Sequence, residues 1–265
     1  MSRAERDAAY NNSAAVVDSA DWISRWTEIS AKRRTDPRAI LDVPYGPKER
    51  NKIDFFPGRD SSAPTLVYIH GGYWQRGARE WYACMGEGVA AHGWSSAILG
   101  YTIAPEARLS EIVREVHAAI AWVGDNTEEY GIGARLILAG WSAGGHLTAL
   151  GLEAPAIEAG LAISGVYELG PIRDTYLNEK LSLSDDEVAR LSPLRLLPAS
   201  KPLAIAYGTR ELPPLVHDSR ALHAMRSAAH LPGPLIPLAG CNHFDALDEL
   251  RKPDGALTRA ALDLC

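Results

Sequence analysis

Short apolar segments recur along the chain and alternate with longer amphipathic stretches. They predict eight strands, at Ile40–Val43, Ile53–Phe56, Leu66–His70, Ser96–Tyr101, Leu136–Ala139, Leu161–Ser164, Leu203–Tyr207 and Leu235–Leu238. Helices are expected between them, at 79–91, 109–124, 143–151, 215–228 and 256–263. Several strands are continuously apolar, and strands alternate with helices after residue 65. We therefore expect an α/β fold, with a mostly parallel eight-stranded sheet covered by helices on both faces.

Two stretches interrupt this alternation. The first two strands flank the turn-like residues 45–50 and are expected to form an antiparallel hairpin at the sheet edge. Residues 171–200 are longer than a simple crossover and contain a helix start signal at Ser184–Glu187. We expect them to form a small cap over the carboxyl edge of the sheet; a plain surface excursion is the alternative.

The residues before the first strand form a further segment. Residues 1–38 are expected to be helical around 18–34 and to pack across the same edge of the sheet. Within them, Tyr10–Asn12 combine an aromatic ring with two amides, which suits either a fold over the site or a disordered terminus. We expect one domain over residues 1–265, to which the N-terminal segment and the cap, at about 171–200, belong.

The composition limits the kinds of partner. Of the 265 residues, 46% are hydrophobic and 23% are charged, as in ordinary globular proteins. A net charge of -6 argues against nucleic acid or an anionic membrane, and no apolar run is long enough to span a bilayer. The polar N-terminus does not resemble a signal peptide, and Cys84, Cys241 and Cys265 are too widely spaced for a disulfide framework or a zinc site. We expect a cytoplasmic protein with a small-molecule substrate, and a homodimer stays open.

The sharpest chemical signal is Gly140-Trp141-Ser142-Ala143-Gly144. It follows the apolar run 136–139 and leads into the helical pattern 143–151. A buried strand, a G-x-S-x-G turn and a helix, in this order, are typical of a nucleophile elbow. The glycines allow the sharp turn, and the helix start points N–H groups at whatever the serine attacks. Ser142 is therefore the candidate nucleophile; a structural Gly-Ser turn is the alternative.

A serine hydroxyl needs a base, and the base needs an acid that orients it. Five histidines follow Ser142, at 146, 217, 223, 230 and 243. His243 is the best placed, because Gly240–Phe244 form a glycine-led loop after the last predicted strand, just before a helix. His146 lies one helical turn after the serine and is expected to pack locally. The other three lie on or just after a predicted helix, where a solvated role is expected.

The acid is expected on the loop after the strand 203–207. Glu211 lies three residues beyond Gly208, where its carboxylate could accept the His243 Nδ1–H and fix the tautomer. Asp218 is the rival, although it falls inside the next predicted helix, and Asp245 is too close to His243 along the chain to face it well. A solvated loop charge is the other role open to Glu211.

An oxyanion hole is expected after the strand 66–70. That strand ends in His70-Gly71-Gly72-Tyr73-Trp74, and the two glycines let N–H groups point into a site rather than along a sheet. The amide of Ala143, the residue after the nucleophile, is expected to pair with those of Gly72 and Tyr73. His70 is expected to brace the loop. From the residues alone, the chemistry is acyl transfer to water, without a metal or an organic cofactor.

These motifs resemble the kynurenine formamidase-like α/β-hydrolases, which are related to esterases and lipases. The H-G-G-x-W form at 70–74 and the elbow Gly140–Leu147 carry the likeness, together with Tyr45–Pro47, Asp54–Phe56 and Leu191–Leu194. It extends over roughly residues 36 to 250. The family acid is often Asp, whereas this chain has Glu211. The resemblance implies hydrolysis of an aryl formamide such as N-formylkynurenine, or of small aryl and alkyl esters.

A flat substrate ring would suit the aromatic side chains near the predicted edge. Tyr73, Trp74 and Phe244 are the candidate substrate contacts, while Tyr101 and Trp141 are expected to be mainly structural and Tyr167 is open. Within hydrolases, a carboxylesterase is the alternative to a formamidase. A ligand-binding protein with the same fold but no activity is the alternative of a different class, and no feature favours a peptidase or a thioesterase.

Overall fold

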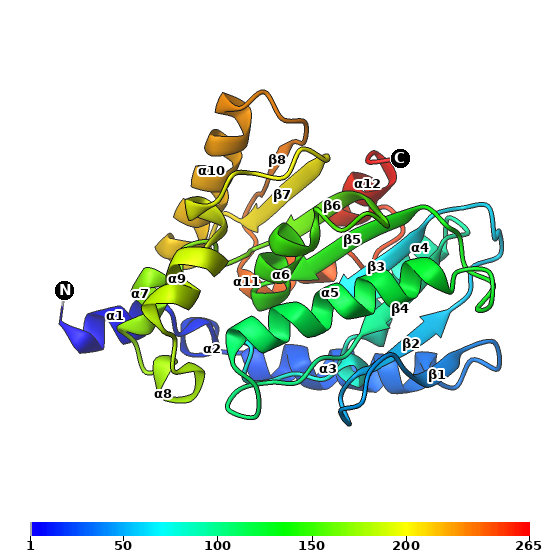
Figure 1. The fold of residues 1–265 in the computed structure, drawn as a ribbon, viewed down its shortest axis with the longest axis horizontal. Coiled ribbons are helices and arrows are strands. Elements are labelled where there is room, and N and C mark those ends of the chain that lie inside the picture. The colour runs from blue at the N-terminus through cyan, green and yellow to red at the C-terminus, as the bar shows by residue number, and fades with distance from the viewer. Residues whose placement is uncertain (1) are drawn as a thin grey trace.

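The apolar segments form an eight-stranded sheet in the order β1-β2-β4-β3-β5-β6-β7-β8 (Figure 1). We describe residues 2–265 of a computed structural model; Met1, which the expected N-terminal segment includes, lies outside the described residues. The strands are β1 (Ile40–Pro44), β2 (Lys52–Phe56), β3 (Thr65–Ile69), β4 (Ser95–Leu99), β5 (Leu136–Trp141), β6 (Ile157–Ile163), β7 (Leu203–Gly208) and β8 (Leu235–Leu238).

The strand pairings confirm the predicted fold class. Strands β3 to β8 pair in parallel, whereas β2 runs antiparallel to both β1 and β4. The pair β1–β2 is the expected hairpin, and β1 is an edge strand. Because parallel strands end on the same side of a sheet, the loops after β3, β5, β6, β7 and β8 all lie at one edge.

Helices cover both faces of this sheet. They are α1 (Arg3–Ala9), α2 (Asn12–Ala15), α3 (Ser19–Arg33), α4 (Glu87–Ala90), α5 (Leu109–Asp125), α6 (Ala143–Gly151), α7 (Gly170–Arg173), α8 (Asn178–Leu181), α9 (Asp185–Leu191), α10 (Pro213–Ala228), α11 (His243–Asp248) and α12 (Ala256–Leu262). Three 3-10 turns join them: η1 (Arg79–Trp81), η2 (Ala83–Gly86) and η3 (Pro193–Arg195). Within residues 2–265, no helix has both the length and the apolar character that crossing a bilayer requires.

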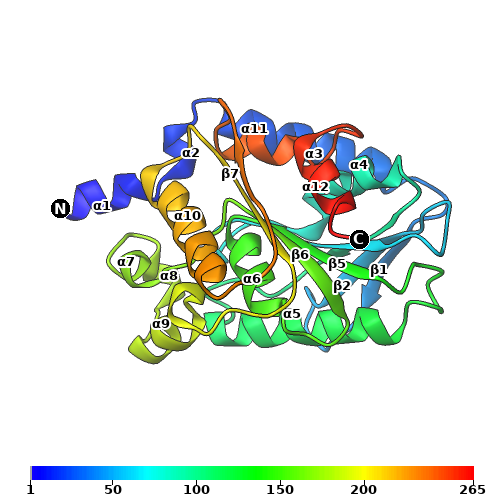
Figure 2. The same cartoon turned by 90° about the horizontal axis from the view of Figure 1, so that it is seen from above.

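Alternate side chains of the central strands enter two separate hydrophobic cores. In β3, Val67 and Ile69 pack with residues of α5 and α6, while Leu66 and Tyr68 pack with residues of α3 and η2. Figure 2 shows these two helical layers, with α3, α4, α11 and α12 on one side of the sheet and α5 on the other. The continuously apolar strands therefore reflect burial on both faces, as the pattern predicted.

The N-terminal helices reach the carboxyl edge of the sheet. Trp26 of α3 is fully buried, and its indole N–H donates to Asp248 Oδ1 at 3.2 Å. Its ring lies 5.7 Å from that of Trp141 and 6.3 Å from that of Phe244. Helix α3 therefore packs against both the end of β5 and the start of α11. Helix α1 lies near α7 and α8, since the backbone N–H of Tyr176 donates to Asp7 Oδ1 at 2.8 Å.

The stretch expected as a cap consists of α7, α8, α9 and η3. Ser184 caps α9 through a capping box with Glu187, as the start signal predicted. The same carboxylate accepts the backbone N–H of Ser110 at 3.1 Å, which ties α9 to the start of α5. Burial opposes ionisation of Glu187, but these hydrogen bonds outweigh it and lower its pKa to about 2.

The prediction of one helix at 79–91 is wrong. This stretch forms η1, η2 and the single-turn helix α4 instead. Its backbone groups bond to α3 rather than along one helix: Ser30 Oγ donates to the Trp81 carbonyl and accepts from the Cys84 N–H, and the Arg33 guanidinium donates to the Ala83 carbonyl. Tertiary partners have therefore replaced the helical hydrogen bonds.

Close backbone approach at α6 should make Gly144 intolerant of any side chain. A Cβ at this position would lie 2.1 Å from the Ile69 carbonyl oxygen. We expect Gly144→Ala to lower the free energy of unfolding by about 2 to 4 kcal/mol, measured by chemical denaturation. Gly131→Ala is the control, because its positive φ of 60° is strained but open space surrounds it, so a loss of about 1 kcal/mol is expected. Equal losses would contradict the steric argument.

Candidate active site

Five loops converge at the carboxyl edge of the parallel strands. They carry His70 after β3, Ser142 after β5, Ser164 after β6, Glu211 after β7 and His243 after β8. Residues separated by more than a hundred positions thus become neighbours because their strands end side by side.

Ser142 occupies a sharp turn between β5 and α6. Its φ of 58° and ψ of −117° are unfavourable for a residue with a side chain. The turn is held by the Ser142 N–H, which donates to the Ile163 carbonyl at 2.8 Å, and by the His146 N–H, which donates to the Ser142 carbonyl at 3.1 Å. A Cβ on Gly140 would lie 2.3 Å from the Gly144 carbonyl oxygen, so the turn requires glycine there. This is the geometry of a nucleophile elbow.

Glu211 and His243 are joined by a short hydrogen bond. His243 Nδ1 lies 2.7 Å from Glu211 Oε2, and both side chains are buried. The other carboxylate oxygen accepts from Ser164 Oγ at 2.5 Å and from the Gly208 N–H at 2.6 Å. The carboxylate is therefore fully engaged, which offsets the cost of burying its charge. It holds the imidazole with Nδ1 protonated, so that Nε2 is left as the basic nitrogen.

The position of His243 on its loop differs from the prediction. It is the first residue of α11 rather than part of a loop before the helix. Asn242 caps this helix, because its side-chain oxygen accepts the N–H groups of Phe244 and Asp245 at 2.8 and 3.1 Å. The capping residue was within the predicted loop, but its side chain is what starts the helix early.

Trp141, expected to be mainly structural, also orients His243. Its indole N–H donates to the His243 carbonyl at 3.0 Å, and the two rings lie 4.7 Å apart. The strand that ends at the nucleophile thus also holds the backbone of the imidazole-bearing residue.

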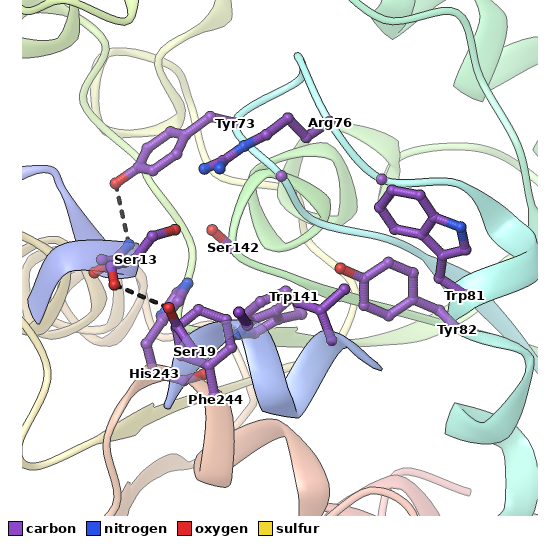
Figure 3. A pocket seen from close by; sticks show the side chains of 15 residues that line it. Ser13, Ser19, Tyr73, Arg76, Trp81, Tyr82, Trp141, Ser142, His243 and Phe244 are labelled. Carbon is purple, nitrogen blue, oxygen red and sulfur yellow. Dashed lines mark hydrogen bonds between the residues drawn. The ribbon is translucent and has the colours of Figure 1, made fainter. Parts of the chain in front are cut away.

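Ser142 and His243 face the same cavity, which has a volume of about 360 Å³ (Figure 3). The described residues include no direct hydrogen bond between these two side chains. Hydrogen bonds of this kind are often long without substrate and shorten when it binds. The cavity size suits a small molecule.

The loop after β3 approaches the elbow closely. A Cβ on Gly71 would lie 2.7 Å from the Trp141 carbonyl oxygen. Gly72 has a φ of 113°, and Tyr73 also has a positive φ, of 51°. Within residues 2–265, the backbone N–H groups of Gly72, Tyr73 and Ala143 donate to no protein acceptor, so they are available to an anionic oxygen in the cavity.

The other candidate bases and acids lie elsewhere. Asp218 accepts the N–H groups of Tyr167 and Glu168 at 2.7 and 3.0 Å, and burial raises its pKa to about 6. His217 and His230 are exposed and His223 is half-buried, on or just after α10. Asp218 is therefore bonded to the loop between β6 and α7 and not to an imidazole.

Two further histidines are buried and neutral. His70 stacks between Tyr101 at 4.3 Å and Tyr82 at 5.7 Å, and its Nδ1 lies 2.8 Å from the Gly71 carbonyl. His146 Nε2 donates to the Leu191 carbonyl at 2.7 Å and so ties α6 to the cap. Burial lowers the pKa of His70 to about 3 and that of His146 to about 4. Both are structural supports, but His146 bonds to a residue 45 positions away, whereas local packing was expected.

Two of the three expected substrate contacts line the cavity. Tyr73 and Phe244 line the cavity. Trp74 does not, and this expectation is wrong: the residue is fully buried, and its indole packs edge-on against His146 with ring centroids 5.0 Å apart. Its positive φ of 57° turns the side chain into the core.

Several cavity residues were not predicted. They comprise five from the N-terminal helices and four that follow the oxyanion loop: Asn12, Ser13, Ser19, Ala20, Ile23, Arg76, Gly77, Trp81 and Tyr82. The N-terminal segment folds over the site, where Asn12 Nδ2 donates to Tyr73 Oη at 3.1 Å. Only the amides next to Tyr10 signalled this role.

Ser164 was also missed, although a polar residue at the end of an apolar strand was its signal. In the described part of the chain, no cluster of three His, Cys, Asp or Glu side chains is arranged to hold a metal.

Known proteins share this sequence and fold. The BD-FAE family model matches residues 53–157. Kynurenine formamidase of Salmo salar is 30% identical over 244 residues, which cover 86% of this chain and 82% of that protein. Esterase LipC of Mycobacterium tuberculosis is 30% identical over 256 residues, covering 83% of this chain and 62% of the esterase. A solved Silicibacter sp. TM1040 protein described as a thioesterase has a TM-score of 0.85 and 28% identity, and the match covers 97% of this chain and 98% of the other.

The buried, neutral His146 should make stability depend on pH. Its folded pKa lies below its usual value of 6.5, so its contribution is complete above that value and is lost as the pH falls toward 4. His146→Gln keeps a donor for Leu191 but does not titrate. We expect the fall in unfolding free energy between about pH 7.5 and about pH 5 to be smaller in this variant by about 1 to 2 kcal/mol, measured with urea. An unchanged pH dependence would show that His146 is protonated equally in both states.

Proposed function

The chain belongs to the kynurenine formamidase family of α/β-hydrolases, and from this premise we propose that it is a serine hydrolase that cleaves a small aryl formamide of the N-formylkynurenine kind. The observation that carries the proposal is the Glu211–His243 hydrogen bond beside Ser142, at one cavity with unpaired backbone amides. A base, its orienting acid, a nucleophile and an oxyanion site are the four parts that acyl transfer needs.

In the proposed first step, His243 Nε2 removes the Ser142 hydroxyl proton and Oγ attacks the formyl carbon. The carbonyl oxygen becomes an anion that accepts hydrogen bonds from the Gly72, Tyr73 and Ala143 amides. Glu211 stabilises the imidazolium without taking its proton. His243 then protonates the arylamine nitrogen, the C–N bond breaks, and Ser142 carries the formyl group.

In the second step, His243 removes a proton from water, which attacks the formyl ester. The tetrahedral oxyanion forms at the same amides, and its collapse returns the proton to Ser142 Oγ and releases formate. No protein atom changes oxidation state, and His243 serves as base and acid in turn.

The walls of the cavity support an aromatic substrate. Trp81, Tyr82 and Phe244 present ring faces and edges to the space beside Ser142 (Figure 3). A carboxylesterase with the same catalytic residues is the second candidate, because Esterase LipC has the same percentage identity to this chain as the formamidase, although the match covers less of the esterase. A cytoplasmic location is part of the proposal, supported by Cys84, Cys241 and Cys265, which are all free thiols.

Substrate preference tests the proposal. We expect the purified protein to release formate from N-formylkynurenine with a higher kcat/KM than it shows for 4-nitrophenyl butyrate. Ser142→Ala should lower kcat by roughly 10³-fold or more, because the members of the triad act as a unit. A fluorophosphonate should add one adduct to the wild type and none to this variant, by intact mass. Faster ester cleavage would favour the carboxylesterase, and a wild type that neither labels nor hydrolyses would refute a hydrolase.

Exchange of the two rival carboxylates tests the acid. Glu211→Gln should lower kcat by about 10³- to 10⁴-fold with little change in KM, because the amide favours the wrong imidazole tautomer. Asp218→Asn is the matched control, since Asp218 bonds to the Tyr167 and Glu168 amides instead. We expect it to retain most of kcat. The assignment fails if Asp218→Asn is the more damaging variant while both proteins melt as the wild type does.

A further inference from the structure

Arg76 carries the permanent charge of the active-site cavity. Among the described residues that line this space it is the sole arginine or lysine, and the lining contains no aspartate or glutamate. Its side chain extends from the loop after β3 into the cavity, so that its guanidinium lies beside the ring of Tyr73 and above Ser142 in the view of Figure 3. Arg76 is therefore the lining residue that can form an ion pair with an anionic ligand.

No protein anion neutralises this charge in residues 2–265. Arg79, three positions further on, shows the contrast: it is buried and bound to the carboxylates of Asp54 and Asp42. The guanidinium of Arg50 binds the carbonyls of Tyr101 and Gly77. Among the described residues, the Arg76 side chain forms no such ion pair or hydrogen bond, so its five donors are available to a ligand.

The backbone that carries Arg76 is held in place. Its N–H donates to the Gly72 carbonyl at 3.0 Å, and a Cβ on Gly72 would lie 2.2 Å from the Arg76 carbonyl oxygen. The tight turn that presents the Gly72 and Tyr73 amides to the cavity thus also fixes the point from which the arginine side chain starts. The same turn therefore positions both the Arg76 side chain and the Gly72 and Tyr73 amides.

The remaining walls do not compete for an anion. They are aromatic at Trp81, Tyr82 and Phe244, and neutral but polar at Asn12 and Ser13. Burial raises the pKa of Tyr82, and the positive charge of Arg76 opposes this rise. The charge is therefore felt across the cavity, at the aromatic wall.

We propose that Arg76 is a specificity-determining residue that binds a carboxylate of the substrate while Ser142 attacks the acyl group. The guanidinium fork matches a carboxylate with two parallel hydrogen bonds, which a lysine cannot provide. The inference rests on the proposed hydrolase function and narrows its substrates to aryl or short acyl compounds that carry a carboxylate within reach of the loop.

The test compares an anionic substrate with its neutral counterpart. One pair is N-formylkynurenine and its carboxamide, and the other is mono-4-nitrophenyl succinate and 4-nitrophenyl butyrate. For each pair that the wild type hydrolyses, the ratio of the two kcat/KM values is measured. We expect Arg76→Gln to lower the anionic-to-neutral ratio by about 10- to 100-fold, mainly through KM, and Arg76→Lys to restore part of it.

Arg59→Gln is the matched control. It removes the same charge from an exposed residue between β2 and β3, at the opposite edge of the sheet from the site, and should leave the ratio unchanged. The inference is overturned if Arg76→Gln lowers both members of a pair equally or leaves the ratio unchanged, and the proposed function then survives. If the wild type hydrolyses none of the four substrates, the proposed function fails and this inference fails with it. Thermal melting confirms that each variant is folded.

Discussion

The whole site depends on close contact between backbone segments that a single methyl group would separate. Gly71 lies against the end of β5, Gly140 against the first turn of α6, and Gly144 against the end of β3. These three contacts bring the oxyanion loop, the nucleophile and the helix start together. Ser142 keeps its strained backbone because the surrounding turns hold it from both sides. The cost of that strain is distributed over the packed sheet edge.

Burial then determines how the polar groups behave. Glu211 folds back on its own turn, since its Oε1 accepts the Gly208 N–H while Ser164 supplies a second donor from the neighbouring strand. One carboxylate thus reaches both its own turn and His243. His70 and His146, which lack a charged partner, are kept neutral by the same burial.

The N-terminal helices form one wall of the cavity at this edge. Trp26 packs against Trp141 and Phe244, and Asn12 bonds to Tyr73, so α2 and α3 contact both the nucleophile side and the oxyanion side of the site. The cap contributes less directly, through the bond between His146 and Leu191. The N-terminal helices thus supply part of the cavity wall, whereas Ser142, Glu211 and His243 follow strands of the sheet.

Local sequence patterns encode the strands, the turn at Ser142, the glycine pair after β3 and the order of the polar residues that follow. Each depends on neighbours a few positions apart, such as the need for glycine in a tight turn. Tertiary packing, by contrast, sets which distant groups meet. In the folded chain, Glu211 and not Asp218 bonds to His243. Trp74 packs in the core, whereas Arg76 lines the cavity. The helix expected at 79–91 does not form, because carbonyl groups of this stretch accept hydrogen bonds from α3. Such choices depend on which strand ends lie side by side and on what space is left there, and no short stretch of sequence contains that information.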